Sequence, residues 1–280
     1  MQDFSTFIRT MYYNTKSKGV TELIQSFKLN VQTMRQKMPV YIFRVDDVLI
    51  DTGPYSMKNE VRNIVKELPI QRVIHTHHHE DHTGNSSWIE RFYSIPQWIH
   101  PLGVQKCSHS TKLPFYRAMF WHNRQAFHPL PLKEDVFKTA EHSFQIVHTP
   151  GHADDHIVLI DEEKGICFSG DLYLFHSPTS NFSFESVPEL IRSIDRTLQY
   201  SFQEVYCSHQ GYLKQGRKLL EKKLAYLQNL QEAVTKAHLE GKTAKEIRKH
   251  LLPKNKLFQY ISLFENSPEH TVKSIIKEIS

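Results

Sequence analysis

The chain has 280 residues, 39% hydrophobic and 23% charged, with a formal net charge of +5, as in an ordinary globular protein. It contains no uninterrupted apolar stretch of about 18 residues, so the sequence predicts no membrane span. Three cysteines, an odd and sparse number, argue against a disulfide framework and predict free buried thiols. The positive charge suits an anionic substrate or RNA, but it is spread along the chain as on an ordinary solvated surface.

The first 100 residues predict short strands that lead into a histidine cluster. The runs 40–45 and 47–53 are joined at Asp46-Asp47, a turn signal. The N-terminus lacks an apolar stretch followed by a small-residue cleavage site, so we expect a cytoplasmic protein. In chain order, the predicted strands are 20–29, 40–45, 47–53, 72–76 and 95–100, and the predicted helices are 61–68 and 83–93.

The rest of the chain changes from strands to helices. We interpret the aromatic and basic stretch 103–127 as a lid-like, partly helical insertion over the site. Short strands mixed with helices, without strict alternation, predict an α/β sandwich, here a main domain over 1–212 and a helical module over 213–280. The predicted strands are 144–148, 156–161, 166–170 and 204–209, and the predicted helical segments are 187–198, about 214–240, 241–251 and a last one from Pro268.

The segment THHHEDHTG at 76–84 places four candidate metal ligands within six residues: His77, His79, Asp81 and His82. It lies between a predicted strand and a predicted helix. A loop there can turn neighbouring side chains toward one point, which a strand cannot do. Imidazole and carboxylate groups are ligands that zinc accepts. For this segment alone, a solvated histidine-rich surface is the alternative.

Three further segments place a candidate ligand at the end of a predicted strand or just after it. His152 follows a Pro-Gly turn in TPGH, Asp171 follows a glycine in SGD, and His209 lies in CSHQG. Glycine allows the backbone to turn sharply beside a metal. In layered α/β folds, sites are built at strand ends, so the repeated order predicts one shared site.

The series HxHxDH, TPGH, SGD and S-H-x-G, preceded by DVLIDTG at 47–53, resembles the metallo-β-lactamase superfamily over about residues 40–211. The resemblance implies a four-layer αββα sandwich with a C-terminal helical extension, and two divalent metal ions. Zinc is the expected metal, with iron or manganese as alternatives. Aspartate rather than cysteine at the bridging position is similar to the glyoxalase II and ribonuclease-like branches. The resemblance assigns one ion to His77, His79 and His152, the other to Asp81, His82 and His209, and the bridge to Asp171.

A dinuclear hydrolase that uses a metal-bridging hydroxide is the function that this resemblance implies, with 1–212 as the catalytic domain. Two ions can lower the pKa of a shared water toward neutrality. Asp81 is the candidate catalytic residue, because it lies inside the ligand loop and can orient the hydroxide and accept its proton. We expect a thioester or other ester of a small anionic or acyl substrate, as in glyoxalase II.

Other functions of the same fold stay open. Acyl-homoserine lactonases usually carry a tyrosine three residues after the bridging aspartate, where this chain has Leu174, with Tyr173 one residue earlier. A phosphodiesterase or endoribonuclease is another alternative, because the tail at 239–253 resembles a small winged-helix-like module, and RNA would then be the partner. A non-catalytic metal-binding protein and an iron-dependent oxygenase complete the alternatives, and β-lactam hydrolysis is the least expected. The sequence does not predict the oligomeric state.

Side chains around the predicted ligands have expected roles of their own. We expect His78 to point away from the metal and His156 to be able to form a hydrogen bond with a ligand. The hypothesis for the insertion is an apolar wall with Arg117 and Arg124 nearby, which would suit an acyl chain with an anionic end.

Overall fold

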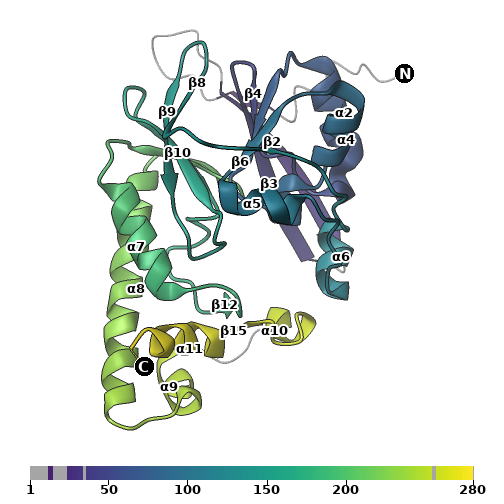
Figure 1. The fold of residues 1–280 in the computed structure, drawn as a ribbon. Coiled ribbons are helices and arrows are strands. Elements are labelled where there is room, and N and C mark those ends of the chain that lie inside the picture. Colours follow the sequence, from purple (N-terminus) through teal and green to yellow (C-terminus); the bar gives the residue numbers. More distant parts are fainter. Residues whose placement is uncertain (1–11, 15–23, 34–35, 254–256, 280) are drawn as a thin grey trace.

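The computed structural model describes residues 12–14, 24–33, 36–253 and 257–279. They form two mixed β-sheets packed face to face, with helices on both outer faces (Figure 1). The strands of the first sheet are β1 (Tyr12–Asn14), β2 (Gln25–Thr33), β3 (Gln36–Val45), β4 (Val48–Ile50), β5 (Arg72–Ile74), β6 (Gln97–Ile99) and β7 (Leu130–Pro131). Those of the second are β8 (Val136–Lys138), β9 (Ser143–His148), β10 (Ile157–Asp161), β11 (Ile166–Gly170), β13 (Glu204–Cys207) and β14 (Gly211–Leu213).

The first sheet keeps the chain order from β1 to β7. Its strands are antiparallel up to β4 and parallel from β4 to β7. The turn between β3 and β4 holds Asp46 at φ 52°, a left-handed conformation that aspartate tolerates better than most residues. Because β4 and β5 are parallel, the residues that follow them, Asp51 and His75, emerge at the same edge.

The second sheet has the order β14-β13-β11-β10-β9-β8. β11 and β13 are parallel, and Gly170 pairs with Cys207 at their ends. The segments that follow these two strands therefore leave the sheet side by side. This register brings Asp171 and His209 to one edge although 38 positions separate them in the sequence.

Three layers of buried apolar side chains hold the fold together. The middle layer joins the inner faces of the two sheets, where the ring of Phe43 lies 5.4 Å from that of Phe168. The outer layer of the first sheet includes Val61, Ile89 and Phe120 from its covering helices. The covering helices of the first sheet are α2 (Lys58–Glu67), α4 (Ser86–Tyr93) and α6 (Phe115–Trp121), and those of the second are α7 (Val187–Leu198) and α8 (Gly216–Leu239). The αββα sandwich expected from the sequence is confirmed.

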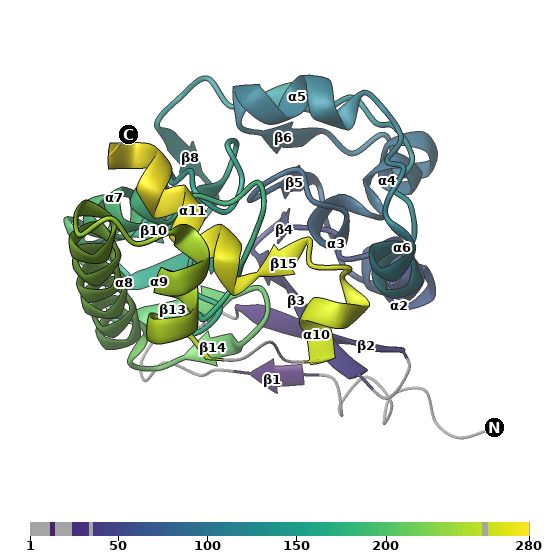
Figure 2. The same cartoon turned by 90° about the horizontal axis from the view of Figure 1, so that it is seen from below.

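The C-terminal helices share the outer layer of the second sheet. Leu220 and Val272 belong to the same buried cluster as Val158 and Val205 of the sheet. Seen from below, the segment from α10 to α11 runs across the ends of both sheets, from the side of α6 to the side of α7 (Figure 2). The predicted boundary at residue 212 falls inside β14, and the division into two modules stays a prediction. The remaining elements are α9 (Ala244–Leu251), α10 (Leu257–Ile261), α11 (Pro268–Ile279), α5 (Pro101–Cys107), the short helix η1 (Tyr55–Met57), and the paired strands β12 (Asn181–Phe182) and β15 (Asn266–Ser267).

The structure differs from the predicted elements at the histidine cluster. The strand predicted at 72–76 ends at Ile74, and the helix predicted at 83–93 begins at Ser86 as α4. A separate short helix, α3 (Glu80–Thr83), lies in the segment predicted as a loop. Two predicted ligands therefore lie on a helical turn instead of an irregular loop. The hydroxyl of Thr83 stabilises this turn by donating to the carbonyl of His79 at 2.9 Å. In the N-terminal region, the described part of the strand predicted at 20–29 begins at Gln25 in β2, and residues 20–23 lie outside the described ranges.

Within the described ranges, no helix combines the length and the apolar character that a membrane span requires.

Candidate metal centre

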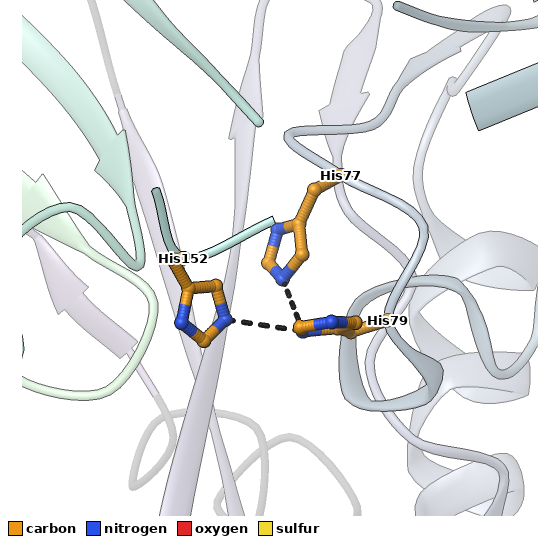
Figure 3. A group of neighbouring side chains, drawn as sticks. All are labelled: His77, His79 and His152. Carbon is orange, nitrogen blue, oxygen red and sulfur yellow. Dashed lines mark hydrogen bonds between the residues drawn. The ribbon is translucent and has the colours of Figure 1, made fainter. Parts of the chain in front are cut away.

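Three histidines from two distant segments meet beside the ends of β5 and β9. The Nε2 atoms of His77 and His152 each lie 3.0 Å from Nδ1 of His79 (Figure 3). All three side chains are buried. A tetrahedral zinc ion, with Zn–N bonds of about 2.0–2.1 Å, would set its nitrogen ligands about 3.3 Å apart, which is close to this spacing. We refer to these residues as the three-histidine group.

A second set of ligand types lies next to the first. Nε2 of His209 is 3.3 Å from Oδ2 of Asp81 and 3.4 Å from Oδ2 of Asp171. Nε2 of His82 is 3.4 Å from Oδ1 of Asp171. We refer to Asp81, His82, Asp171 and His209, whose donor atoms are all within 4.8 Å of one another, as the mixed group.

The carboxylate of Asp171 lies between the two groups. Its Oδ2 is 3.3 Å from Nε2 of His152 and 3.4 Å from Nε2 of His209. A carboxylate at this position can contact two cations at once, and the sequence predicts the same bridging position for it. The structure thus brings together all seven side chains that the sequence predicts as ligands.

Two buried atoms indicate that cations fit this arrangement. Nε2 of His82 and Oδ1 of Asp171 lie 3.4 Å apart as an ion pair, but among the described residues neither has a well-formed hydrogen bond. A buried polar atom without a partner is costly. Both atoms face the centre of the mixed group, where a cation would satisfy them.

The electrostatics favour neutral imidazoles at two members of the three-histidine group, His77 and His79. Burial, together with the neighbouring histidines, lowers the pKa of His77 and of His79 well below its ordinary value. Only the neutral imidazole offers a lone pair to a metal. Burial raises the pKa of Asp171, but His209 and His82 outweigh this effect and hold the pKa well below its ordinary value. For His152, burial lowers the pKa, but the hydrogen bond to Glu185 and the charge of Asp171 outweigh it and raise the pKa. His77 and His79 therefore offer neutral nitrogens, and Asp171 offers a carboxylate that stays charged.

The sequence model described as the metallo-beta-lactamase superfamily matches residues 44–226, more than half of the chain. The chain belongs to the metallo-β-lactamase superfamily.

Three proteins of related sequence show how far the sequence similarity extends. The chain is 25% identical over 259 residues to a probable metallo-hydrolase of Bacillus subtilis, covering 76% of this chain and 80% of that protein. It is 27% identical over 136 residues to the hydroxyacylglutathione hydrolase GloC of Haemophilus influenzae, covering 44% of this chain and 59% of that one. It is 29% identical over 115 residues to an atrochrysone carboxyl ACP thioesterase of Aspergillus aculeatus, covering 41% of this chain and 31% of that one. The chain thus spans less than two thirds of the length of the last two relatives.

Among solved structures, a metallo-beta-lactamase family protein from Thermus thermophilus superposes with a TM-score of 0.64 at 22% identity, covering 91% of this chain and 93% of that one. The predicted family and fold are confirmed, and so is the prediction of a hydrolase at the level of the family. Zinc and a cytoplasmic location stay predictions.

In this superfamily member, three of the candidate histidine ligands each have an oxygen acceptor beside Nδ1. Nδ1 of His82 lies 2.7 Å from Oδ2 of Asp51, and Nδ1 of His152 lies 2.6 Å from Oε1 of Glu185. Nδ1 of His209 lies 2.9 Å from the carbonyl oxygen of Pro39. An acceptor at Nδ1 places the proton there and leaves Nε2 free for a metal. The sequence analysis missed Asp51 and Glu185 as functional residues. Asp51 carried a signal, its place at a strand end in the DTG motif, whereas Glu185 carried none.

Asp51 also anchors the start of the ligand loop. Its carboxylate accepts hydrogen bonds from the backbone nitrogen and the hydroxyl of Thr76, both at 2.8 Å. The residue has a left-handed backbone, with φ 62°. One buried carboxylate therefore fixes both a ligand ring and the strand end that carries the loop.

Exchange of Asp51 for asparagine is expected to weaken binding of the ion in the mixed group by about 10- to 100-fold. The amide presents one acceptor oxygen where the carboxylate presents two, so His82 loses its anionic partner, while asparagine tolerates the left-handed backbone. Competition with a chromophoric chelator measures the affinity. Asp46→Asn is the matched control, because Asp46 has a similar φ of 52° in a turn away from the ligands. Equal affinities in the two variants would contradict the role given to Asp51.

His156 and His78 lie next to the ligands and take different positions. Nε2 of His156 accepts a hydrogen bond from the backbone nitrogen of Asp171 at 3.0 Å, so this ring supports the bridging residue. Nδ1 of His78 lies 2.7 Å from Oδ1 of Asp155, away from both ligand groups, as the sequence predicts. The three cysteines are free and buried, which confirms that prediction. Burial raises the pKa of Cys207, so this thiol is no ready nucleophile.

A cavity of about 500 Å³ opens beside the three-histidine group. Its apolar part comes from Leu113 and Pro114 of the predicted insertion and from Phe184. The ring of Phe184 lies edge-on to His79, with centroids 5.5 Å apart. The insertion therefore forms one wall of a space next to the ligands. The lining residues are His78, His79, Glu80, Lys106, Thr111, Lys112, Leu113, Pro114, Arg117, Ala153, Asp154 and Phe184.

The two arginines of the insertion do not act as a pair facing a substrate. Arg124 is buried and donates to the backbone carbonyls of Lys106 and Cys107, both at 3.0 Å, so the hypothesis is wrong for this residue. These carbonyls end α5, where an arginine is favoured by the helix dipole and by unpaired acceptors. Arg117 lines the cavity, but it donates to both carboxylate oxygens of Glu80, at 2.7 and 2.9 Å. It therefore holds the insertion against the ligand segment.

Proposed function

We propose that the chain is a dinuclear metal-dependent hydrolase that cleaves thioesters or other esters of small acyl compounds. The observation that carries this proposal is the position of Asp171 between two complete ligand groups. The donor set of imidazoles and carboxylates fits zinc best, with manganese or iron as alternatives.

When bound, two divalent ions lower the pKa of a water molecule toward neutrality and polarise the oxygen of the substrate that is attacked. The chain contributes the orientation of the groups around them. Asp81 is the residue that we propose to orient the attacking water and accept its proton, because its carboxylate lies in the mixed group, 3.3 Å from Nε2 of His209.

Two observations favour an acyl substrate. The cavity beside the three-histidine group has an apolar side made by Leu113, Pro114 and Phe184. Two relatives carry the names of a hydroxyacylglutathione hydrolase and an acyl-carrier-protein thioesterase. Tyr173, the nearest counterpart of the lactonase tyrosine, is buried in the core under the second sheet, which does not favour a lactonase. A small molecule, rather than RNA, is therefore the proposed partner.

The test is a turnover screen of the zinc- or manganese-loaded protein against thioesters, lactones and phosphodiesters. We expect the thioesters to give the highest kcat/KM. Asp81→Asn is expected to lower kcat by about 10²- to 10⁴-fold, because it removes the proposed proton acceptor. If the protein binds two ions but turns over phosphodiesters alone, the proposed substrate class is contradicted. If it binds two ions and turns over none of the substrates, it is a non-catalytic metal-binding protein.

A further inference from the structure

A continuous hydrogen-bond path joins the three-histidine group to the C-terminal helix α11. It begins at His152, whose Nδ1 lies 2.6 Å from Oε1 of Glu185. The other oxygen of Glu185, Oε2, accepts from the side-chain amide of Asn181 at 3.0 Å and from the backbone nitrogen of Phe182 at 2.8 Å. Both oxygens of this carboxylate are thus held, which fixes the acceptor that orients the ligand.

The path continues from Asn181 into the C-terminal segment. Oδ1 of Asn181 accepts a hydrogen bond from the hydroxyl of Thr271 at 2.8 Å. The two side chains are buried, at 4% and 0% exposure. Every donor in the path points the same way, from Thr271 through Asn181 to Glu185. The carboxylate of Glu185 therefore accepts its remaining hydrogen bond from the N–H at Nδ1 of His152, which leaves Nε2 without a proton and available to a metal.

The backbone around the path ties the same two segments together. β12 and β15 pair antiparallel, with Asn181 opposite Ser267 and Phe182 opposite Asn266. The backbone nitrogen of Ser186 donates to the carbonyl of Gly151 at 2.8 Å, next to the ligand His152. The C-terminal segment and the ligand turn are thus joined through the six residues from Asn181 to Ser186.

Docking of α11 does not require this polar path. Val272 and Ile275 are fully buried in the cluster under the second sheet and supply the apolar contact of the helix. A fully satisfied buried polar network adds less to stability than to the choice of one conformation. The hydroxyl of Thr271 thus contacts the path at Asn181, while the apolar side chains of α11 supply its docking contacts.

We infer that Thr271 is a positioning residue for the metal ligand His152, acting through Asn181 and Glu185, so that the C-terminal segment sets the affinity of the three-histidine group. This inference rests on the proposed function only in that the three-histidine group binds an ion. It gives the C-terminal segment a part in the metal site itself.

The experiment measures zinc affinity of the full chain, without substrate, by competition with a chromophoric chelator. Thr271→Val keeps the shape of the side chain and removes the hydroxyl, and we expect it to weaken binding at the three-histidine group by about 10-fold. Thr271→Ser keeps the hydroxyl and is expected to bind zinc as the unchanged protein does. Thr197→Val is the matched control, because Thr197 is an equally buried threonine whose hydroxyl donates to the carbonyl of Ser193, outside the path.

A double-mutant cycle with Glu185→Gln separates positioning from general stability. If Thr271 acts through Glu185, the Thr271→Val change has no added effect on zinc affinity once Glu185→Gln is present. The inference is overturned, while the proposed function stands, by either of two results. One is an equal loss of zinc affinity from Thr271→Val in both backgrounds. The other is a zinc affinity of Thr271→Val equal to that of Thr197→Val. Absence of zinc binding by the unchanged protein overturns both. Thermal unfolding of the metal-free variants shows whether a lost affinity follows from a damaged fold.

Discussion

Replacing Asp171 by asparagine is expected to lower kcat by about 10³-fold or more and to remove at least one metal ion. The carboxylate lies within 3.4 Å of nitrogens from both ligand groups, so its loss affects both cation positions at once. Each ion supplies several kcal/mol of charge stabilisation in the transition state, and each 1.4 kcal/mol corresponds to about tenfold in rate. Elemental analysis and steady-state kinetics on the same preparation measure the two effects together.

Asp161→Asn is the control for this prediction. Asp161 is also a buried aspartate at the end of a strand, where it lies 2.9 Å from Nδ1 of His142 and away from the ligands. We expect this variant to lose stability but to keep its metal content and its kcat. If Asp171→Asn keeps two ions and near-normal turnover, the bridging role is excluded.

Gly84→Ala is expected to lower the stability of the protein strongly, because Gly84 is closely packed at the end of the ligand segment. A Cβ atom at this position would lie 2.3 Å from the backbone nitrogen of Tyr55, 2.7 Å from the carbonyl carbon of Pro54 and 2.8 Å from the carbonyl oxygen of Glu80. All three are backbone atoms, so a methyl group must displace η1 or the turn that carries the ligands. We expect a loss of about 3 kcal/mol in the free energy of unfolding and a melting temperature lower by roughly 6 °C or more.

Gly165→Ala separates steric overlap from backbone strain. Gly165 has φ 69°, and its Cβ would meet no atom within 4 Å, so only the left-handed backbone opposes alanine there. We expect a loss of about 1 kcal/mol, measured by the same thermal or denaturant unfolding. If Gly84→Ala costs no more than Gly165→Ala, then the ligand turn adjusts freely and the close packing around Gly84 is not a constraint.

The seven candidate ligands could be proposed from the sequence because each lies in a recognisable local pattern, and the structure places them close together. Asp171 directly follows β11, and His77 and His152 lie in the short segments just after β5 and β9. The strands themselves are marked by runs of buried apolar residues. The order in which parallel strands end then brings the ligands together, and this order is a property of the fold that the motifs identify. The fold and the candidate ligands could therefore be read from local signals.

The groups that orient these ligands could not be predicted in the same way. Glu185 meets His152 across 33 positions, and Asn181 meets Thr271 across 90. The strands β12 and β15, which bring them together, have two residues each and no periodic pattern that a sequence can display. For Arg124 the sequence predicted a contact that the structure does not have. A charged residue in an aromatic stretch suggests an exposed substrate contact, but Arg124 is buried and donates to backbone carbonyls. Such long-range polar contacts depend on the completed tertiary structure.

The cluster shared by the second sheet and the C-terminal helices limits how this protein can be shortened or recombined. Ending the chain near residue 213 would remove Leu220, Leu227, Val234 and Val272, all of which lie fully buried over the sheet. Each such side chain contributes about 1.5–3 kcal/mol by its burial, so their combined loss is comparable with the whole stability of a typical domain. A homologous chain with a different C-terminal segment would need other apolar side chains to cover this face of the second sheet. It would also need another hydrogen-bond partner for Asn181.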